Sequence, residues 1–303
     1  RPLLLLALAM TCGLVPGQDA GWQAHPGNPV VESGWTAPGD LLVNDPCVRR
    51  EGSSYRMWYS KGPGLGVNHV KIYQATSSDG IDWAHDPAPL LTADSDVSVT
   101  GPGLHPDVTG TYKIVGEQTA DLVNGQAAYK LEGADWYLWY DDTASQYRIS
   151  DVCGALGTAS WLGTGGMIVD GAFGAASGVA TGSPVASSAW DSGKIETPMV
   201  ILIDGTYHLY YSGARIGDGD GQYQIGHATS HDGTVWVKDP ANPVVPYHAD
   251  PNRWGYYTAA EPSVVYSASE GTFYLYYSTI KYRGAAYDGT PFTNFQGIAV
   301  ATS

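Results

Sequence analysis

Internal repetition is the feature that most constrains what this chain can fold into. Three segments share an acidic, proline-containing opening, and each is followed by a strand-like run in which aromatic residues alternate with other residues. The openings are Asp45-Pro46-Cys47-Val48, Glu196-Thr197-Pro198-Met199-Val200 and Glu261-Pro262-Ser263-Val264-Val265. The aromatic runs are 55–60, 207–212 and 273–278, and a fourth copy lies at 136–141. Period-two alternation of aromatic and β-branched residues predicts strands.

A third strand recurs after each aromatic run and completes a repeating unit. It ends in Thr-Ser at 72–77, 225–230 and 298–303, and two of the copies continue through Asp-Gly into a tryptophan. Asp-Gly between strand-like segments is a strong hairpin signal. No window of helical period competes with this pattern, so each unit is predicted to be a four-stranded antiparallel sheet. Repeated sheets of this length predict an all-β fold, a β-propeller.

The two ends of the chain carry complementary parts of one repeat. Residues 22–31 match residues 236–245, which follow the third strand of a complete unit. Residues 298–303 lack such a following strand. We therefore expect the N- and C-terminal strands to pair in one blade and to close the ring without exposed edges.

The number of blades depends on the long interval between the first two openings. That interval has room for two further blades, near 95–127 and 128–180, which makes a five-bladed propeller the favoured interpretation. Two alternatives remain open: a single blade with an insertion at 163–188, or a chain that continues beyond Ser303.

Composition and the first residues bear on location and partners. Asp and Glu number 30 against 15 Lys and Arg, a formal charge of −15, which argues against nucleic acid and against anionic membrane surfaces. The apolar run at 2–15 is too short to span a membrane and suits a signal peptide. We expect a signal peptide at 1–20, a propeller catalytic domain at 21–303, and a secreted, periplasmic or cell-surface protein. Cys12 leaves a lipid anchor open as an alternative.

The remaining cysteines, Cys47 and Cys153, are too few to form a disulfide framework. They lie in no metal-binding spacing, and either a disulfide or two free thiols is compatible with the sequence.

The acidic residue at each repeat opening is the strongest candidate for chemistry. In a propeller the innermost strands converge on the axis, so Asp45, Glu196 and Glu261 are expected to surround a central pocket. Turn chemistry is the alternative for Asp before Pro, but Glu has no such turn preference. Carboxyl groups held close together cannot all ionise at the same pKa. One therefore stays protonated and can act as an acid, while another is ionised and can act as a base or nucleophile. Such a cluster beside aromatic rings is suited to cleaving glycosidic bonds.

These openings, the Tyr-x-Leu-Tyr-Tyr-Ser strands and the Ala-Thr-Ser-x-Asp-Gly-x-x-Trp unit resemble the five-bladed propeller glycosidases. That superfamily contains glycoside hydrolase family 43 and the related family 32, and the resemblance covers nearly the whole chain after residue 20. It implies that Asp45 is the general base or nucleophile, that Glu196 or Glu261 is the general acid, and that the other glutamate tunes its pKa. Asp107 is a lesser candidate for the tuning acid.

The expected function is an exported glycoside hydrolase that acts on an arabinan- or xylan-type polysaccharide or oligosaccharide. Aromatic and imidazole rings would bind the substrate, because flat apolar faces with a polar tip suit sugar rings. The candidates are Trp58, Trp35, Trp139, His208 and Trp254. The resemblance implies no required cofactor and no catalytic metal. Asp218-Gly219-Asp220-Gly221 is either half of a structural calcium loop or a hairpin tip.

Three other functions remain open. One is a fructosidase similar to family 32, one is a carbohydrate-binding propeller without hydrolytic activity, and one is an interaction scaffold. We expect a carbohydrate partner, no nucleic acid and no membrane insertion, and the sequence leaves the oligomeric state open.

Overall fold

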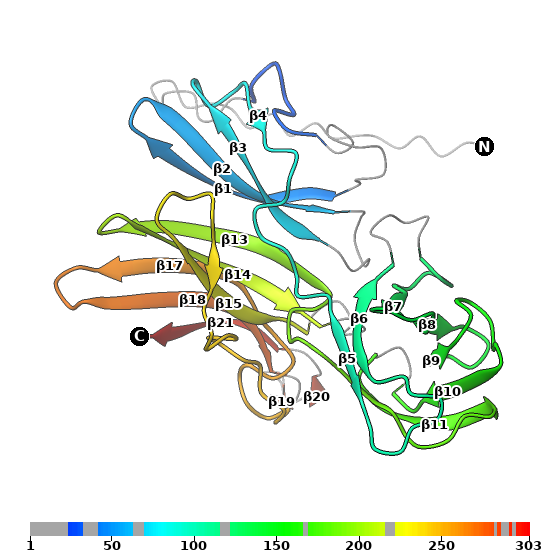
Figure 1. The fold of residues 1–303 in the computed structure, drawn as a ribbon. Coiled ribbons are helices and arrows are strands. Elements are labelled where there is room, and N and C mark those ends of the chain that lie inside the picture. Colours follow the sequence, from blue (N-terminus) through cyan, green and yellow to red (C-terminus); the bar gives the residue numbers. More distant parts are fainter. Residues whose placement is uncertain are drawn as a thin grey trace, which may run out of the picture.

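The computed structural model describes residues 24–32, 42–62, 70–115, 122–165, 169–215, 222–281, 284–285, 291–292 and 295–303. All regular structure in these ranges is β, which confirms the all-β prediction. Three stacked sheets make up one part of the molecule, and one closed sheet lies to their side (Figure 1). The predicted signal peptide lies outside the described residues.

Sheet 1 contains four antiparallel strands from the first repeat. They are β1 (Leu42–Glu51), β2 (Ser54–Gly62), β3 (Lys71–Ser77) and β4 (Ala84–His85). Sheet 2 repeats this order with β13 (Lys194–Ile203), β14 (Thr206–Ala214), β15 (Gln224–Ser230) and β16 (Val237–Lys238). The prediction of four-stranded antiparallel units is confirmed for these two sheets.

Sheet 3 contains three strands of the last repeat. They are β17 (Ala259–Ser267), β18 (Thr272–Lys281) and β21 (Phe295–Thr302). In the chain segment between β18 and β21, two short strands pair with each other: β19 (Gly284–Ala285) and β20 (Pro291–Phe292).

The turn between the third and fourth strands is built in the same way in sheets 1 and 2. In sheet 1 the Ser77 hydroxyl and the Asp79 carboxylate accept backbone N–H groups of the turn. Ser230 and Asp232 do the same in sheet 2. The glycine after each aspartate has a left-handed φ, +82° at Gly80 and +74° at Gly233, which a residue with a Cβ adopts only at a cost. The repeated Ser-x-Asp-Gly motif therefore forms and stabilises this turn.

The sheets stack in the order 1, 2, 3 (Figure 1). Apolar side chains fill both junctions between them. Trp58 and Ile72 of sheet 1 pack on Val200, Leu209 and Tyr211 of sheet 2. A second core cluster joins sheet 2 to sheet 3; it contains Tyr210, Ile225, Ala259, Val264 and Leu275.

Residues 97–188 do not form the two separate blades that the sequence predicted. Their eight strands run as one antiparallel meander, and β12 pairs with β5 to close the sheet on itself. The strands are β5 (Val97–Thr100), β6 (Gly110–Ile114), β7 (Tyr129–Leu131), β8 (Tyr137–Asp141), β9 (Gln146–Ser150), β10 (Ala159–Gly163), β11 (Gly171–Gly178) and β12 (Val185–Ser188). The closed sheet has its own core, which includes Tyr112, Tyr129, Tyr147, Trp161 and Phe173. A count of five blades is therefore not confirmed.

The described residues do not show the predicted closure by the two ends either. The described part of the expected N-terminal strand, 24–32, forms no strand. Val30 and Val31 instead pack on sheet 1, beside Met57 and Tyr59. Sheet 3 lies on the far side of sheet 2 from sheet 1, so these ends cannot share one sheet within this arrangement (Figure 1).

Candidate functional site

The candidate site is built on a β-bulge that recurs in the first strand of each stacked sheet. The pairing register shifts between Asn44 and Cys47 in β1, between Glu196 and Met199 in β13, and between Ala260 and Ser263 in β17. A bulge adds an unpaired residue, bends the strand and redirects a side chain.

One residue in each bulge has a left-handed backbone. The φ angles are 53° at Asp45, 55° at Thr197 and 56° at Glu261, and each residue precedes a proline. For a residue with a Cβ this conformation costs roughly 1–2 kcal/mol. Because the same strained conformation occurs at three equivalent positions, the bulge is a repeated feature of the fold and not a local irregularity.

These registers correct the alignment of the repeats. Thr197, and not Glu196, is the structural counterpart of Asp45 and Glu261, while Glu196 corresponds to Asn44 because each pairs with a serine of the second strand. The signal was present in the sequence as the distance to proline. Asp45 and Glu261 directly precede proline, whereas Thr197 separates Glu196 from Pro198.

A serine at the same place in each second strand links the bulges to one another. The Ser60 hydroxyl accepts the backbone N–H of Thr197 at 2.9 Å, and the Ser212 hydroxyl accepts the N–H of Glu261 at 2.9 Å. Thr197 Oγ1 lies 2.6 Å from Ser212 Oγ, and Ser278 donates to Glu261 Oε2 at 2.6 Å. Each serine therefore holds the bulge side chain of its own sheet, and two of them also hold the bulge backbone of the next sheet.

Asp45, Thr197 and Glu261 line one pocket of about 520 Å³. Its walls also include the three prolines that follow these residues, together with Cys47, Val48, Arg49, Met199 and Val200. The structure thus brings together two of the predicted acids, Asp45 and Glu261, on opposite sides of a threonine.

Burial and the charge of Glu261 act on the carboxyl group of Asp45. Burial raises the pKa of Asp45 above its ordinary value, and the negative charge of Glu261 raises it further. Hydrogen bonds from Ser60 and Thr197 oppose this increase in the pKa without cancelling it. A carboxyl group with a raised pKa is a stronger base and exchanges protons closer to neutral pH.

The other two predicted acids lie elsewhere. Glu196 does not line this pocket; its Oε1 lies 4.0 Å from Nζ of the buried Lys194. Asp107 belongs to the closed sheet, where its carboxylate accepts the backbone N–H and the hydroxyl of Thr109. These bonds lower the pKa of Asp107 and give it a role in a turn.

Two predicted substrate-binding tryptophans are in fact core residues. Trp58 is fully buried between sheets 1 and 2, and Trp139 is buried with its indole N–H bonded to Ser150 Oγ at 2.8 Å. Neither ring offers a face to a ligand, because both are buried. An aromatic ring with a polar tip packs in a core as well as it stacks on a sugar, so the sequence alone did not distinguish the two roles. Trp35 lies outside the described residues.

The other two residues predicted to bind substrate have different surroundings. Trp254 is exposed and packs beside Gly297 of β21, where any side chain would collide with its ring. His208 lines a separate pocket of about 250 Å³ between sheets 2 and 3. Its Nδ1 lies 3.1 Å from Nε2 of His227, whose Nδ1 lies 3.1 Å from Asp239. His208 is thus part of a polar chain outside the carboxylate pocket.

The described residues also bear on the predictions about metal sites, membrane-spanning helices and cysteine pairing. No group of three or more His, Cys, Asp or Glu side chains in those ranges is arranged to hold a metal ion, and the predicted calcium loop lies outside them. No helix in the same ranges is long and apolar enough to cross a bilayer. Cys47 and Cys153 are free, which settles the alternative between a bridge and two thiols.

No protein-family model and no curated protein matches this chain. Among solved structures it is similar to Zg3597, a family 117 glycoside hydrolase of the marine bacterium Zobellia galactanivorans. That match has 12% identity and a TM-score of 0.41, and it covers 86% of this chain and 52% of the other. A putative glycoside hydrolase from Parabacteroides distasonis matches with 14% identity and a TM-score of 0.39, covering 90% of this chain and 62% of the other.

A thermostable family-43 glycoside hydrolase is also similar, with 15% identity, a TM-score of 0.27, and coverage of 86% of this chain and 89% of the other. This chain spans only about half to two thirds of the length of the first two structures. Identities and TM-scores at this level carry neither an activity nor a substrate across, so the functional conclusion depends on the site itself.

Proposed function

We propose that this protein is a glycoside hydrolase whose catalytic pair is Asp45 and Glu261. The observation that supports it is the shared pocket of about 520 Å³, in which two carboxyl groups on separate sheets face the same space. The raised pKa of Asp45, caused mainly by burial and to a smaller extent by the charge of Glu261, also supports the proposal.

Hydrolysis of a glycosidic bond needs two carboxyl groups in different protonation states. One donates a proton to the leaving oxygen as its bond to the anomeric carbon breaks. The other is ionised, and it either activates the attacking water or attacks the anomeric carbon itself. We assign the ionised role to Asp45, in agreement with the family resemblance, and the proton donor to Glu261.

The supporting residues have defined tasks in this proposal. Ser278 orients the Glu261 carboxyl group through the hydrogen bond to Oε2, and Ser60 does the same for Asp45. Arg49 lines the pocket and carries a positive charge near the hydroxyl groups of a bound sugar. The substrate we propose is an arabinan- or xylan-type polysaccharide or oligosaccharide, as the resemblance implies.

The test is product release from arabinan, xylan, galactan, fructan and aryl glycosides. Asp45→Asn and Glu261→Gln should each abolish turnover while sugar affinity, measured by calorimetry, is retained. Glu196→Gln is the matched control, because it makes the same chemical change one residue outside the bulge position, and it should keep most of the activity. Loss of activity in Glu196→Gln with full activity in Glu261→Gln would refute the assignment of the acid.

A carbohydrate-binding protein without hydrolytic activity is the second candidate, and one observation favours it. The bulge position of sheet 2 is occupied by Thr197, and among the described residues that line the pocket no acid other than Asp45 and Glu261 is present to tune the pKa of the proton donor. If no glycoside in the panel is cleaved, and if Asp45→Asn or Glu261→Gln weakens sugar binding, this second function replaces the first.

A further inference from the structure

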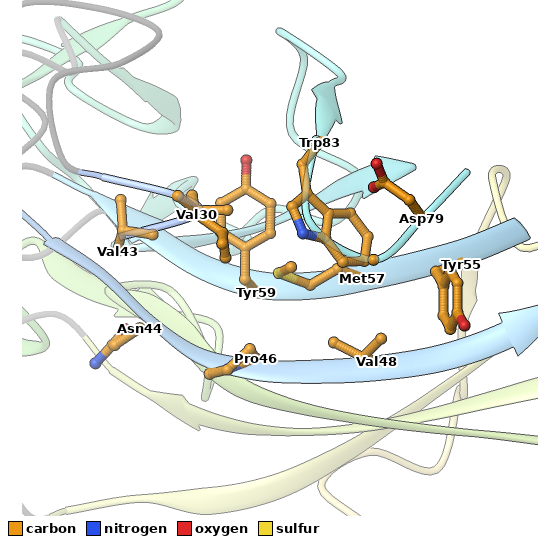
Figure 2. A pocket seen from close by; sticks show the side chains of 12 residues that line it. Val30, Val43, Asn44, Pro46, Val48, Tyr55, Met57, Tyr59, Asp79 and Trp83 are labelled. Atoms are coloured by element: carbon orange, nitrogen blue, oxygen red, sulfur yellow. The ribbon is translucent and has the colours of Figure 1, made fainter. Parts of the chain in front are cut away.

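The stack of three sheets ends on each side in an apolar face that no described sheet covers. On sheet 1 this face forms a pocket of about 490 Å³ that Val48, Tyr55, Met57, Tyr59 and Trp83 line (Figure 2). Val48 is exposed there, whereas Met57, Tyr59 and Trp83 are buried in a cluster on which Val30 and Val31 pack. We call it the sheet 1 open face. On sheet 3 the outward face carries four exposed apolar or aromatic residues: Val265, Tyr276, Ile298 and Val300, with exposed fractions of 57%, 42%, 81% and 51%. We call it the sheet 3 open face.

Each open face is one half of a junction that the molecule builds twice inside the stack. The strand registers make Val48 and Met57 of sheet 1 equivalent to Val200 and Leu209 of sheet 2. In sheet 3 the equivalent pair is Val264–Leu275. In sheets 2 and 3 this pair is buried against the preceding sheet. In sheet 1 no described sheet covers the pair: Val48 is exposed, and Met57 is buried in a cluster with Val30 and Val31.

The opposite face shows the same relation in reverse. Trp58 of sheet 1, Tyr210 of sheet 2 and Tyr276 of sheet 3 are equivalent by register. Trp58 and Tyr210 are buried against the following sheet, while Tyr276 is exposed. The stack therefore holds two complete junctions and the two separate halves of a third.

A short apolar segment is already in place for the third junction. At the first junction Leu91 pairs with Ile72 and packs between the sheets, and at the second Val245 pairs with Ile225 in the same way. Val31 is the equivalent residue by sequence and packs on the sheet 1 open face. The residue equivalent to Ile72 and Ile225 in sheet 3 is Ile298, which is largely exposed.

The serine contacts extend the same pattern. Ser60 accepts an N–H from the bulge of the following sheet, and so does Ser212. Ser278 holds the equivalent place in sheet 3, where no described sheet follows. The equivalent donor would be the N–H of Asp45, which begins the bulge of sheet 1.

We propose that the sheet 1 open face of one copy of this chain docks on the sheet 3 open face of a second copy. The partner is a second copy because both halves of the missing junction belong to this chain and lie on opposite sides of the stack. In the complex Val31 of one copy pairs with Ile298 of the other. Burying four exposed apolar side chains supplies the driving force.

The contact is head to tail, so each copy keeps one half of a junction available after the first contact forms. Such heterologous contacts close into a ring or extend into an open chain, according to the rotation between copies. Two copies joined through both junctions would be the smallest closed assembly. This inference concerns the outer faces of the stack and does not depend on the proposed hydrolase activity.

The experiment measures the mass of the full chain in solution by light scattering after gel filtration, over a range of concentrations. Wild type should have at least twice the chain mass. Ile298→Asp changes the sheet 3 open face, and Val48→Asp changes the sheet 1 open face. Both side chains are exposed within one copy, so either variant should fold and remain a monomer.

Mixing the two variants gives the decisive result. Val48→Asp retains an intact sheet 3 face and Ile298→Asp an intact sheet 1 face, so together they can form one junction. The equimolar mixture should therefore show a 1:1 dimer that neither variant forms alone. Val179→Asp, which alters an exposed valine on the closed sheet, is the matched control and should associate like wild type.

Three outcomes would overturn the proposal. The first is wild type that stays monomeric at every concentration. The second is association that Ile298→Asp and Val48→Asp leave unchanged, which would locate the contact elsewhere. The third is a mixture of the two variants that remains monomeric, which would show that the two faces do not bind each other. Circular dichroism of each variant identifies any that fails to fold, and Val300→Lys then replaces Ile298→Asp.

Discussion

A hydrogen bond between sheets 1 and 2 provides a direct test of their stacking. The hydroxyl of Tyr207, in sheet 2, donates to Glu51 Oε1, in sheet 1, at 2.8 Å, although 155 residues separate them in the chain. Arg56 Nη2 lies 3.1 Å from the other carboxylate oxygen of Glu51. The bond exists only if the two sheets are neighbours in spite of the 97–188 insertion.

The size of the effect follows from the burial of the pair. A hydrogen bond to a charged group contributes about 1.5–3 kcal/mol in a well-buried setting. Glu51 and Tyr207 are partly exposed, so screening by solvent reduces the expected coupling to about 1 kcal/mol. The same bond, after the larger effect of burial, raises the pKa of Tyr207.

The assay is a double-mutant cycle on urea unfolding, with wild type, Tyr207→Phe, Glu51→Gln and the double variant. The matched control is Tyr274→Phe with Glu270→Gln, which removes the same kind of bond at 2.8 Å within sheet 3, between exposed residues. Its coupling should be smaller than that of the Glu51–Tyr207 pair, because solvent screens the bond between two exposed groups. If the Glu51–Tyr207 coupling is no larger than the control, sheets 1 and 2 are not packed as described and the reasoning fails.

Three further predictions concern the closed sheet, Asp45 and the cysteines. Residues 97–188 expressed alone should fold and unfold cooperatively, because β12 pairs with β5 and the core is internal; a random-coil circular dichroism spectrum would contradict this. Burial raises the pKa of Asp45 in the folded state, so its stabilising contribution exists at low pH and is lost as pH rises through the folded pKa. Asp45→Asn should therefore be more stable than wild type at neutral pH, and the difference in melting temperature should shrink as pH falls through the raised folded pKa toward about 3.9, the ordinary aspartate pKa, and stay constant below it; a difference that does not change between neutral pH and about 3.9 would contradict this. In denaturant without reductant, mass spectrometry should find Cys47 and Cys153 both alkylated, and a mass that retains a disulfide between them would contradict the free thiols.

The repeated strands were predictable because their signal is local. The alternation at 207–212 and 273–278 predicts β14 and β18, and each Ser-x-Asp-Gly motif predicts its turn. Local hydrogen bonds and side-chain alternation decide these features, so a short window of sequence contains them.

The site was only partly predictable. Asp45 and Glu261 share a pocket as the repeat alignment implied, yet Glu196 does not join them because the bulge places Thr197 at the equivalent position. A bulge shifts every later side chain by one residue, and only the spacing to proline indicated it. Trp58 was misassigned because an aromatic ring in a strand gives no sign of whether a second sheet will cover it.

The sequence by itself determined that this protein is all-β, that it is built from repeated antiparallel sheets, and that an acid stands near the start of several of them. Those properties follow from the side-chain period of a strand and the chemistry of turns, which act between residues close in the chain. Only the tertiary structure decided that residues 97–188 close into a sheet of their own. It alone decided that sheets 1 and 2 pack directly on each other, although these residues lie between them in the sequence. It also decided that no described sheet covers the apolar face at either end of the stack. These outcomes depend on which apolar face covers which, a choice among many similar strands that only long-range packing resolves.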